Sequence, residues 1–247
     1  MKKRALIDGD VVLYEVTASC EQAHDWGDDM WTLHSDFREA RQKFDCWVAD
    51  MNKVLKTDQV LVALSDKQNW RKSVLETYKA NRKGKRKPLT YPALRRYVEQ
   101  TYKVSCMPTL EADDVLGIHA TDPKKKTEDI VVTIDKDLKT VPGFHFNPNH
   151  PEDGVVEVSR EQADFNHLMQ SVAGDPVDGY SGCPGIGPVR AERMLKECPN
   201  WQGVVKIYES KSLSSDDALL QARVARILRY GEYDLMTETV KLWSPDE

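Results

Sequence analysis

Short runs of apolar, β-branched residues recur along the first 160 residues, and segments with apolar positions at helical spacing lie between them. Three of these runs have the length and composition of buried parallel strands: residues 4–7, 60–64 and 129–134. A further run at 154–159 suits an edge strand. The pattern therefore predicts a mainly parallel sheet.

Helical patterns connect these runs. The segment 37–55 places its apolar residues on one face, as expected for a helix that crosses between the first two strands. Two more helices are predicted, at 91–103 and 111–120. After residue 160 the pattern is helical. The fold class predicted is α/β, a parallel sheet flanked by helices, with a core over 1–170 and a helical subdomain over 171–247.

The composition excludes several kinds of protein. No apolar run approaches membrane-spanning length, and Asp8 and Asp10 interrupt the first apolar run, so we expect no membrane partner and no signal peptide. We expect the chain to stay in the cytoplasm in which it is made. Five scattered cysteines with no C-x-x-C pair argue against a disulfide framework and against a zinc site.

The formal net charge of −5 hides a strongly basic segment. Ten Lys or Arg and one acid, Glu76, lie between Arg71 and Arg96, and six of the nine residues in 79–87 are basic. Such a run is often only a solvated surface loop. The alternative is a phosphate-binding insertion at about 70–100, because closely spaced cations bind nucleic acid by releasing its condensed counterions.

Acidic residues follow each predicted strand. Because the carboxyl ends of parallel strands meet at one edge of a sheet, where binding crevices form, we expect these acids to lie close together. Two further stretches, LEADDVLG and GDPVDG, add acids one helical turn apart. The candidate metal ligands are Asp8, Asp66, Glu111, Asp113, Asp114, Asp135, Asp137, Asp175 and Asp178.

Nine carboxylates cannot share a small volume unless cations neutralise them. With these nine set apart, the formal net charge of −5 becomes +4 for the rest of the chain. Carboxylate oxygens without His or Cys select Mg²⁺ or Mn²⁺. A site of this size suits two ions about 4 Å apart, an arrangement that activates water and stabilises the leaving oxygen in phosphodiester cleavage.

Taken one at a time, these acids would usually cap helices or turns. Their joint placement favours the metal site. Asp10, Asp28, Asp29 and Asp36 lack that support, and we interpret them as surface or turn residues.

Six stretches in the same order resemble the flap-endonuclease-like 5′-nuclease family: LIDGD, ALSDKQNWRK, YKANRKGKRKP, LEADDVLG, TIDKDL and GDPVDGYSGCPGIGP. Within the family the chain is most similar to the 5′→3′ exonucleases of short-tailed lytic bacteriophages. The likeness runs over nearly the whole chain and would place a phage-encoded protein in the cytoplasm of the infected bacterium.

The resemblance implies that the parallel sheet is PIN-like and that all nine acids are metal-site residues. It also implies that residues around 70–100 form a basic helical arch over them. Lys79 and Arg82 match positions that grip the scissile phosphate, and Tyr78 matches one that stacks on a base. Arg71 and Lys83 are further candidate DNA contacts.

The resemblance also identifies residues 182–188 as the hairpin of a helix-hairpin-helix unit that grips duplex DNA. Gly182, Gly185 and Gly187 would let backbone N–H groups reach phosphates, with Arg190 beside them. A monovalent cation at the hairpin is implied too. The case for that ion is weaker here, because PVR at 188–190 replaces the Lys-Thr pair that is common in the family.

The implied activity is divalent-metal-dependent 5′→3′ hydrolysis of duplex DNA from ends, flaps or RNA primers, by a protein expected to be a monomer. One alternative is a haloacid-dehalogenase-like phosphatase, since DGDVV and GDPVD resemble its motifs with Asp8 as nucleophile and Asp10 as acid. That fold would leave Glu111 and Asp113 unused. A non-catalytic DNA-binding protein is the other alternative, although every expected acid is present.

Overall fold

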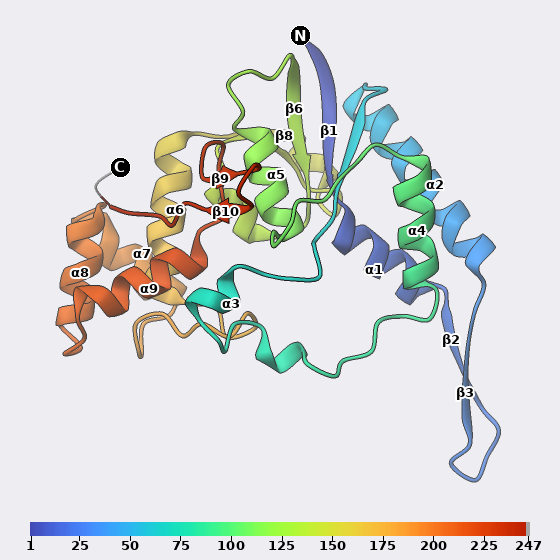
Figure 1. Ribbon diagram of the computed structural model, residues 1–247, viewed down its shortest axis with the longest axis horizontal. Helices are drawn as coiled ribbons and strands as arrows, with labels where there is room; N and C mark the ends of the chain where they lie inside the picture. Colours follow the sequence, from blue (N-terminus) through green and yellow to red (C-terminus); the bar gives the residue numbers. More distant parts are fainter. Residues whose placement is uncertain (246–247) are drawn as a thin grey trace.

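The computed structural model describes residues 1–245 (Figure 1). Within this range six strands form one sheet in the order β5-β4-β1-β6-β7-β8. All neighbours are parallel except β7 and β8. The strands are β1 (Lys2–Asp8), β4 (Val60–Ala63), β5 (Val104–Ser105), β6 (Thr127–Val132), β7 (Gly143–Phe146) and β8 (Val155–Val158). The predicted α/β class with its parallel sheet is confirmed.

Helices cover both faces of this sheet. The helices that connect its strands are α1 (Gly9–Ser19), α2 (Phe37–Leu55), α3 (Arg71–Val74), α4 (Tyr91–Thr101) and α5 (Ala112–Ala120). The helices beyond the sheet are α6 (Arg160–Ala173), α7 (Pro188–Glu197), α8 (Trp201–Glu209) and α9 (Ser215–Ala225). None of the helices described is long and apolar enough to cross a membrane.

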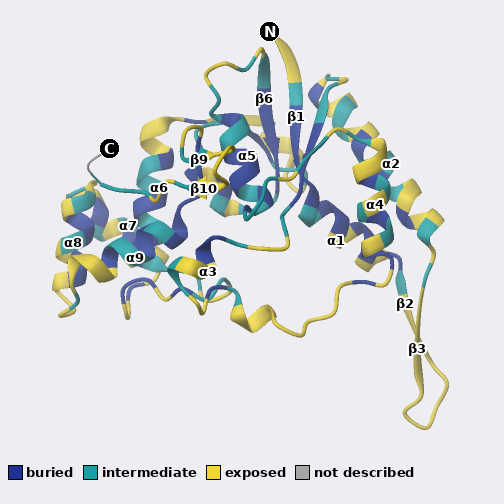
Figure 2. Cartoon of the chain, in the orientation of Figure 1, coloured by how far each residue is buried: buried dark blue, intermediate teal, exposed yellow. Residues whose placement is uncertain are grey.

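Alternate residues of the central strands feed two separate cores. On β1, Ala5 and Ile7 pack with α1, α2 and α4, whereas Leu6 packs with α5. This is the two-residue period of a strand that is buried on both faces, and it explains why the run in 4–7 is uniformly apolar. The carboxyl-terminal parts of β1 and β6 are accordingly dark blue in the burial view (Figure 2).

The predicted division of the chain differs from the packing seen here at both ends of the helical part. Helix α6 shares a core with α7, α8 and α9, so the helical cluster begins at Arg160 rather than at 171. The segment after α9 then returns to the sheet, where Ile227 and Leu228 pack against α5. A short two-stranded sheet follows there, formed by β9 (Tyr233–Asp234) and β10 (Thr239–Val240).

The helix predicted at 37–55 matches α2 at both ends, because Asp36 caps its N-terminus and Lys56 ends it in a left-handed conformation. The sequence analysis missed α1 and also the projecting hairpin of β2 (Glu21–Asp25) and β3 (Trp31–Ser35) (Figure 1). Within the predicted arch, 70–100, α3 and α4 are helical, whereas the segment 75–90 between them contains only a 3₁₀ turn, Ala80–Arg82. It is largely exposed (Figure 2).

Buried His167 on α6 makes stability depend on pH. Its Nε2 lies 2.8 Å from the Ala222 carbonyl oxygen on α9. Burial, and next the Arg226 guanidinium, lower the pKa of His167 to about 3. The unfolded chain therefore takes up this proton below about pH 6.5 while the folded protein does not, so the stability supplied by neutral His167 is lost as pH falls.

We predict that this residue lowers the free energy of unfolding by about 2 kcal/mol between about pH 8 and pH 5. The His167→Gln variant keeps a hydrogen-bond donor for the Ala222 carbonyl but has no group that titrates. Its free energy of unfolding should therefore fall by about 2 kcal/mol less than that of the wild type over the same pH range. Urea denaturation at both pH values measures the difference. Equal losses in the two proteins would contradict the assignment.

Candidate active site

The carboxyl ends of the parallel strands surround a pocket of about 340 Å³. Eight carboxylates line it, and we call it the acidic pocket: Asp8, Asp10, Glu111, Asp113, Asp135, Asp137, Asp175 and Asp178. Seven of the nine predicted acids thus lie together, although they come from four separate stretches of the chain. Their meeting follows from the parallel order of β1 and β6 and from α5 starting beside them.

Asp8 ends β1 and caps α1. Its Oδ1 accepts a hydrogen bond from the Val11 backbone N–H at 3.4 Å, and its Oδ2 accepts one from the Thr133 hydroxyl at 3.0 Å. Asp10, in the first turn of α1, accepts from the Ser65 N–H at 3.0 Å and from the Tyr91 hydroxyl at 3.1 Å. Both carboxylates are therefore fixed in place.

Asp135 and Asp137 follow β6 in one tight turn. The Asp135 Oδ1 accepts from the backbone N–H of Asp137 at 2.9 Å, and the Asp137 Oδ1 accepts from the Gln170 amide at 2.7 Å. Because Gln170 lies on α6, this contact ties the 135–137 turn to the helical part of the chain.

Asp175 and Asp178 share a turn after α6. The Asp175 Oδ1 accepts from the Val177 N–H at 2.7 Å and from the Asp178 N–H at 3.3 Å. The Asp178 carbonyl in turn accepts from the Lys79 N–H at 2.7 Å. The turn thus connects the acidic pocket with the basic segment.

The negative charge in this pocket is only partly balanced. Burial, and next the Asp10 carboxylate, raise the pKa of Asp8 to about 7. Burial and then Asp135 raise the pKa of Asp137 to about 7 as well. For Asp113, burial, Asp8 and Asp135 raise the pKa well above its ordinary range. A divalent cation is what such oxygen-only donors can take up to relieve this repulsion.

The oxygen donors of the acidic pocket are of the kind that bind divalent ions, but they are not already arranged around a single point. Among residues 1–245, no three acidic, histidine or cysteine side chains already converge on one point as metal ligands do. Two cations from the basic segment, Lys79 and Arg82, supply part of the neutralisation.

Lys79 is the first of these cations. Its ammonium lies 2.6 Å from Glu111 Oε1 and 3.3 Å from Asp178 Oδ2. Burial would raise the pKa of Glu111, but Arg71 and Lys79 outweigh it and hold the pKa at about 2. Arg82, half exposed, contacts the other Asp178 oxygen at 2.6 Å. Both predicted phosphate-gripping residues therefore stand at the pocket.

Arg71 and Asp114 form a buried ion pair beside the pocket instead of contributing to its wall. The Arg71 guanidinium donates two bonds to Asp114, at 2.7 and 2.8 Å, and others to Glu111 and to the carbonyls of Val224 and Arg226. Asp114 is fully buried and also accepts from the Trp70 indole and the Leu228 N–H.

This network leaves neither partner available for the predicted contacts. The Asp114 oxygens are taken by protein donors, and the Arg71 side chain is only 3% exposed, so a DNA contact is not open to it in this conformation. Its role here is to join α3, α5 and the segment after α9. The Tyr78 ring is likewise buried, with its hydroxyl 2.9 Å from Glu111 and 3.2 Å from Asp178.

Asp66 lies outside the acidic pocket. Its Oδ2 accepts from the Thr109 N–H at 2.9 Å, and this bond is the largest cause of its lowered pKa. The structure therefore brings the neighbouring Ser65, not Asp66, to the pocket wall. Lys83 is exposed on the basic segment.

The hairpin 182–188 has a buried side and an exposed side. Gly182, with φ of +61°, is buried against the backbone of Gly174, where a Cβ would collide with the main chain. Gly185, with φ of +74°, and Gly187 are exposed, and a Cβ at either would meet nothing within 4 Å among the described atoms. Gly187 and Pro188 start α7, and Arg190 is exposed on its first turn.

Three residues at this site escaped the sequence analysis. Asp10 was interpreted as a surface or turn residue, yet it lines the acidic pocket. Its position in the first turn after Asp8 was the available signal. Thr133 and Gln170, which hold Asp8 and Asp137, carry no signal in a single sequence because their partners lie far away along the chain.

Comparison with known proteins bears directly on this site. A family described as 5′-3′ exonuclease, N-terminal resolvase-like domain, matches residues 5–145. The chain is 27% identical to an exodeoxyribonuclease of Enterobacteria phage T3 over 97% of its own length and 92% of that protein. It is 26% identical to an exonuclease of Escherichia phage T7, over 97% and 93% of the two chains.

The fold has solved neighbours as well. The flap endonuclease of bacteriophage T5, in a pseudo-enzyme-product complex with DNA and metal ions, has a TM-score of 0.66 and 12% sequence identity. The match covers 91% of this chain and 89% of that one. At this identity the likeness shows the fold alone.

The two kinds of acid should respond oppositely to loss of charge in metal-free buffer. Asp114→Asn removes the fully buried anionic partner of Arg71 and leaves it only Glu111, so it should lower the free energy of unfolding by about 3–5 kcal/mol. Asp137→Asn removes one of several crowded negative charges and should raise it, on the order of 1 kcal/mol. Thermal and urea unfolding with EDTA provide the measurement; destabilisation of similar size in both variants would contradict the distinction.

Proposed function

The chain belongs to the 5′-3′ exonuclease family, and on that premise we propose that it hydrolyses phosphodiester bonds of duplex DNA from 5′ ends, with two Mg²⁺ or Mn²⁺ ions in the acidic pocket. The observation that carries the proposal is the meeting of eight carboxylates at the carboxyl edge of the sheet, next to Lys79 and Arg82. No serine, cysteine or histidine nucleophile is needed for this chemistry.

The seven predicted acids that line the acidic pocket, together with Asp10, would hold the ions. When bound, divalent ions activate water and take up the negative charge that develops on the departing oxygen. The protein's own part is orientation: Thr133 fixes Asp8, Gln170 fixes Asp137, and the 174–180 turn fixes Asp175. We assign Asp114 to supporting the site through Arg71, and Asp66 to the loop around Thr109.

We propose that Lys79 and Arg82 exchange their carboxylate partners for the scissile phosphate when substrate enters. Both already sit at the pocket, and Arg82 is half exposed. An Arg fork binds a phosphate through two parallel bonds, and Lys supplies a compact charge. Lys83, exposed on the same segment, is a further candidate for the strand.

The exposed half of the hairpin is the proposed grip on the duplex. Gly185 and Gly187 leave the backbone open, and α7 presents its N-terminus with Arg190 beside it. Such contacts recognise phosphates and shape, so sequence preference should be weak. Gly182 packs against the backbone of Gly174 on the buried side of the hairpin and is not a proposed DNA contact. A monovalent cation at this hairpin remains part of the proposal.

Related activities follow from the same site. We propose that flaps and RNA annealed to DNA are also cleaved, and that the protein acts as a monomer in the cytoplasm of an infected bacterial cell. Family membership favours the nuclease over the phosphatase that DGDVV and GDPVD suggested. A binding protein without chemistry would retain DNA affinity but release no product.

Asp135→Asn tests the metal assignment. On a 5′-labelled duplex with Mg²⁺, we expect cleavage to fall by at least about 100-fold, because a ligand at the centre of the acidic pocket is lost. The wild type with EDTA should show the same loss. Undiminished cleavage by the folded variant would refute the assignment, and turnover of a small phosphate ester would favour the phosphatase.

Lys79→Ala tests the proposed phosphate grip. We expect cleavage to slow by about 10²-fold or more while duplex affinity falls less than tenfold, since the residue would act mainly at the scissile bond. Single-turnover rates and duplex titration in Ca²⁺ separate the two effects. Lys85→Ala, an exposed neighbour away from the acidic pocket, is the matched control. Equal losses in rate and affinity would make Lys79 only an anchor.

A further inference from the structure

The segment between α3 and α4 contacts the acidic pocket at both of its ends. Near its start, Lys79 contacts Glu111 at 2.6 Å. At its other end α4 begins with Tyr91, and the hydroxyl of that residue binds Asp10, another carboxylate of the acidic pocket. The first contact is an ion pair, whereas the second is a hydrogen bond from a neutral group.

The Tyr91 hydroxyl holds Asp10 from a fixed position. It donates to the Asp10 Oδ1 at 3.1 Å. The Tyr91 ring is only 3% exposed and packs in the core that α1, α2 and α4 share, so the hydroxyl has little freedom to move. The other oxygen, Oδ2, accepts from the Ser65 backbone N–H at 3.0 Å. Tyr91 thus supplies the side-chain contact, and Ser65 the main-chain contact, that orient this carboxylate.

Arg95, one turn further along α4, adds charge near Asp10. Its Nη1 lies 3.8 Å from the Asp10 Oδ1, beyond hydrogen-bond distance. Its Nη2 donates to the Ser65 carbonyl at 2.9 Å, and its Nε donates to Glu99 at 2.9 Å. The hydrogen bonds of Arg95 are therefore made elsewhere, and the hydroxyl of Tyr91 remains the group that sets the direction of the Asp10 carboxylate.

Lys87 lies on the ring of Tyr91, with its ammonium 4.0 Å from the ring centroid. A cation–π contact of this kind holds an ammonium group without neutralising it. The chain on both sides of Lys87 is fixed, because the Arg86 Nη1 and the Leu89 N–H each donate to the Glu21 Oε2 at 2.8 Å. Lys87 is thus held in one place while it is exposed to solvent.

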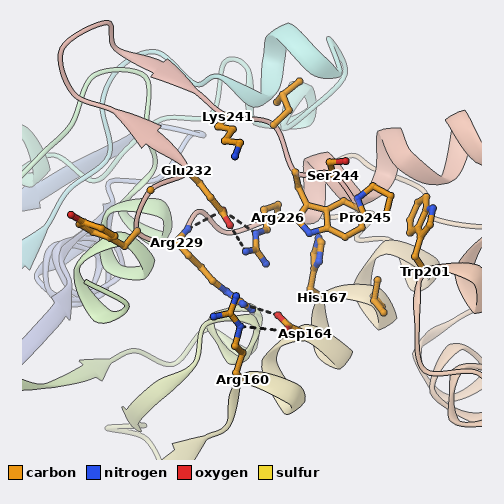
Figure 3. Close-up of a pocket in the computed structure, with 15 residues that line it drawn as sticks. Arg160, Asp164, His167, Trp201, Arg226, Arg229, Glu232, Lys241, Ser244 and Pro245 are labelled. Atoms are coloured by element: carbon orange, nitrogen blue, oxygen red, sulfur yellow. Dashed lines mark hydrogen bonds and ion pairs between the residues drawn. The ribbon is translucent and has the colours of Figure 1, made fainter. Parts of the chain in front are cut away.

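Lys87 differs from cations that already have acidic partners. In the pocket of about 380 Å³ between α6, α8 and the segment after α9 (Figure 3), Arg226 donates to Glu232 at 3.0 Å and Arg229 contacts Asp164 at 2.6 Å. Lys87 has its ring contact but no ion pair within residues 1–245. Its charge is therefore available to an anion from outside the chain.

On the premise of the proposed function, we propose that Tyr91 is a positioning residue with two tasks. Its hydroxyl holds Asp10 in the orientation in which that carboxylate serves a divalent ion. Its ring holds Lys87 for a phosphate of the bound strand other than the one that is cleaved. Unlike Lys79 and Arg82, Lys87 has no carboxylate to release when a strand arrives, so it contributes to DNA affinity rather than to the chemical step.

Titration with Mn²⁺ in a calorimeter, without DNA, tests the first task. Tyr91→Phe keeps the buried ring and removes only the hydroxyl. It should weaken the tightest Mn²⁺ site about tenfold, because hydrogen bonds to a ligand carboxylate govern metal affinity on this scale. Tyr97→Phe is the matched control, since the Tyr97 hydroxyl lies on the same helix but donates to Asp45, outside the acidic pocket. This control should bind Mn²⁺ as the wild type does.

The outcomes separate this inference from the proposed function. Equal Mn²⁺ affinity in the wild type and in Tyr91→Phe would overturn the role of the hydroxyl and leave the metal site standing. Equal weakening in Tyr91→Phe and Tyr97→Phe would also overturn it, because loss of any hydroxyl on α4 would then have the same effect. A wild type that binds no Mn²⁺ would overturn both proposals.

Duplex titration at saturating Ca²⁺ tests the second task. Lys87→Met keeps an unbranched chain over the ring but removes the charge, so it should weaken duplex binding about fivefold and should not weaken Mn²⁺ binding. Tyr91→Phe keeps the ring under Lys87 and should retain duplex affinity. Lys2→Met is the matched control, because Lys2 is exposed at the end of β1 opposite to Asp8.

The two variants should therefore fail in opposite assays. Equal duplex affinity in Lys87→Met and Lys2→Met would refute the strand contact. Loss of both Mn²⁺ and duplex affinity in Tyr91→Phe would mean that Tyr91 only supports the fold, and would refute the positioning role.

Discussion

Mutual repulsion among carboxylates is the constraint on which the rest of this structure depends. The carboxyl ends of the parallel strands place acidic side chains at one edge of the sheet, where they lie close together. The protein meets this strain in two ways. Lys79 and Arg82 bring cations from the basic segment, while hydrogen bonds from Thr133 and Gln170 hold individual carboxylates in place. The repulsion that remains would be relieved if the pocket bound divalent ions, as we propose.

The stretch LEADDVLG supplies two carboxylates of the acidic pocket and also the buried carboxylate that pairs with Arg71. Glu111 and Asp113 face the acidic pocket, whereas Asp114 turns inward to Arg71. Arg71 also donates to the carbonyls of Val224, in the last turn of α9, and of Arg226, directly after it. A single guanidinium therefore holds together the start of the basic segment, α5 and the end of α9. A buried charge with several partners fixes one arrangement of three distant segments, at the cost of desolvation.

Sequence patterns predicted the features that depend on residues close together in the chain. Apolar runs predicted β1, β4 and β6, and the capped amphipathic stretch predicted α2. Strand order predicted that Asp8, Asp135 and Asp137 would meet at one edge of the sheet, whereas the acids of LEADDVLG and GDPVDG were predicted from their motifs. The predictions that failed concern residues whose partners lie far away in the chain. From the sequence, Asp114 was predicted to be a metal ligand and Arg71 a DNA contact, but the fold buries them together as an ion pair. The β2–β3 hairpin was missed because its residues are mostly polar or exposed and lack a buried face.

The contact between Gly174 and Gly182 has a mechanical consequence. These two backbones are so close that a side chain at either position would collide with the other, so the loop bearing Asp175 and the hairpin bearing Gly185 are packed backbone to backbone as one piece. If one end of that piece holds the reacting phosphate and the other holds the double helix, the distance between the two contacts is fixed by the protein. The position of the cut would then be counted from the duplex by the protein backbone itself, whatever the base sequence.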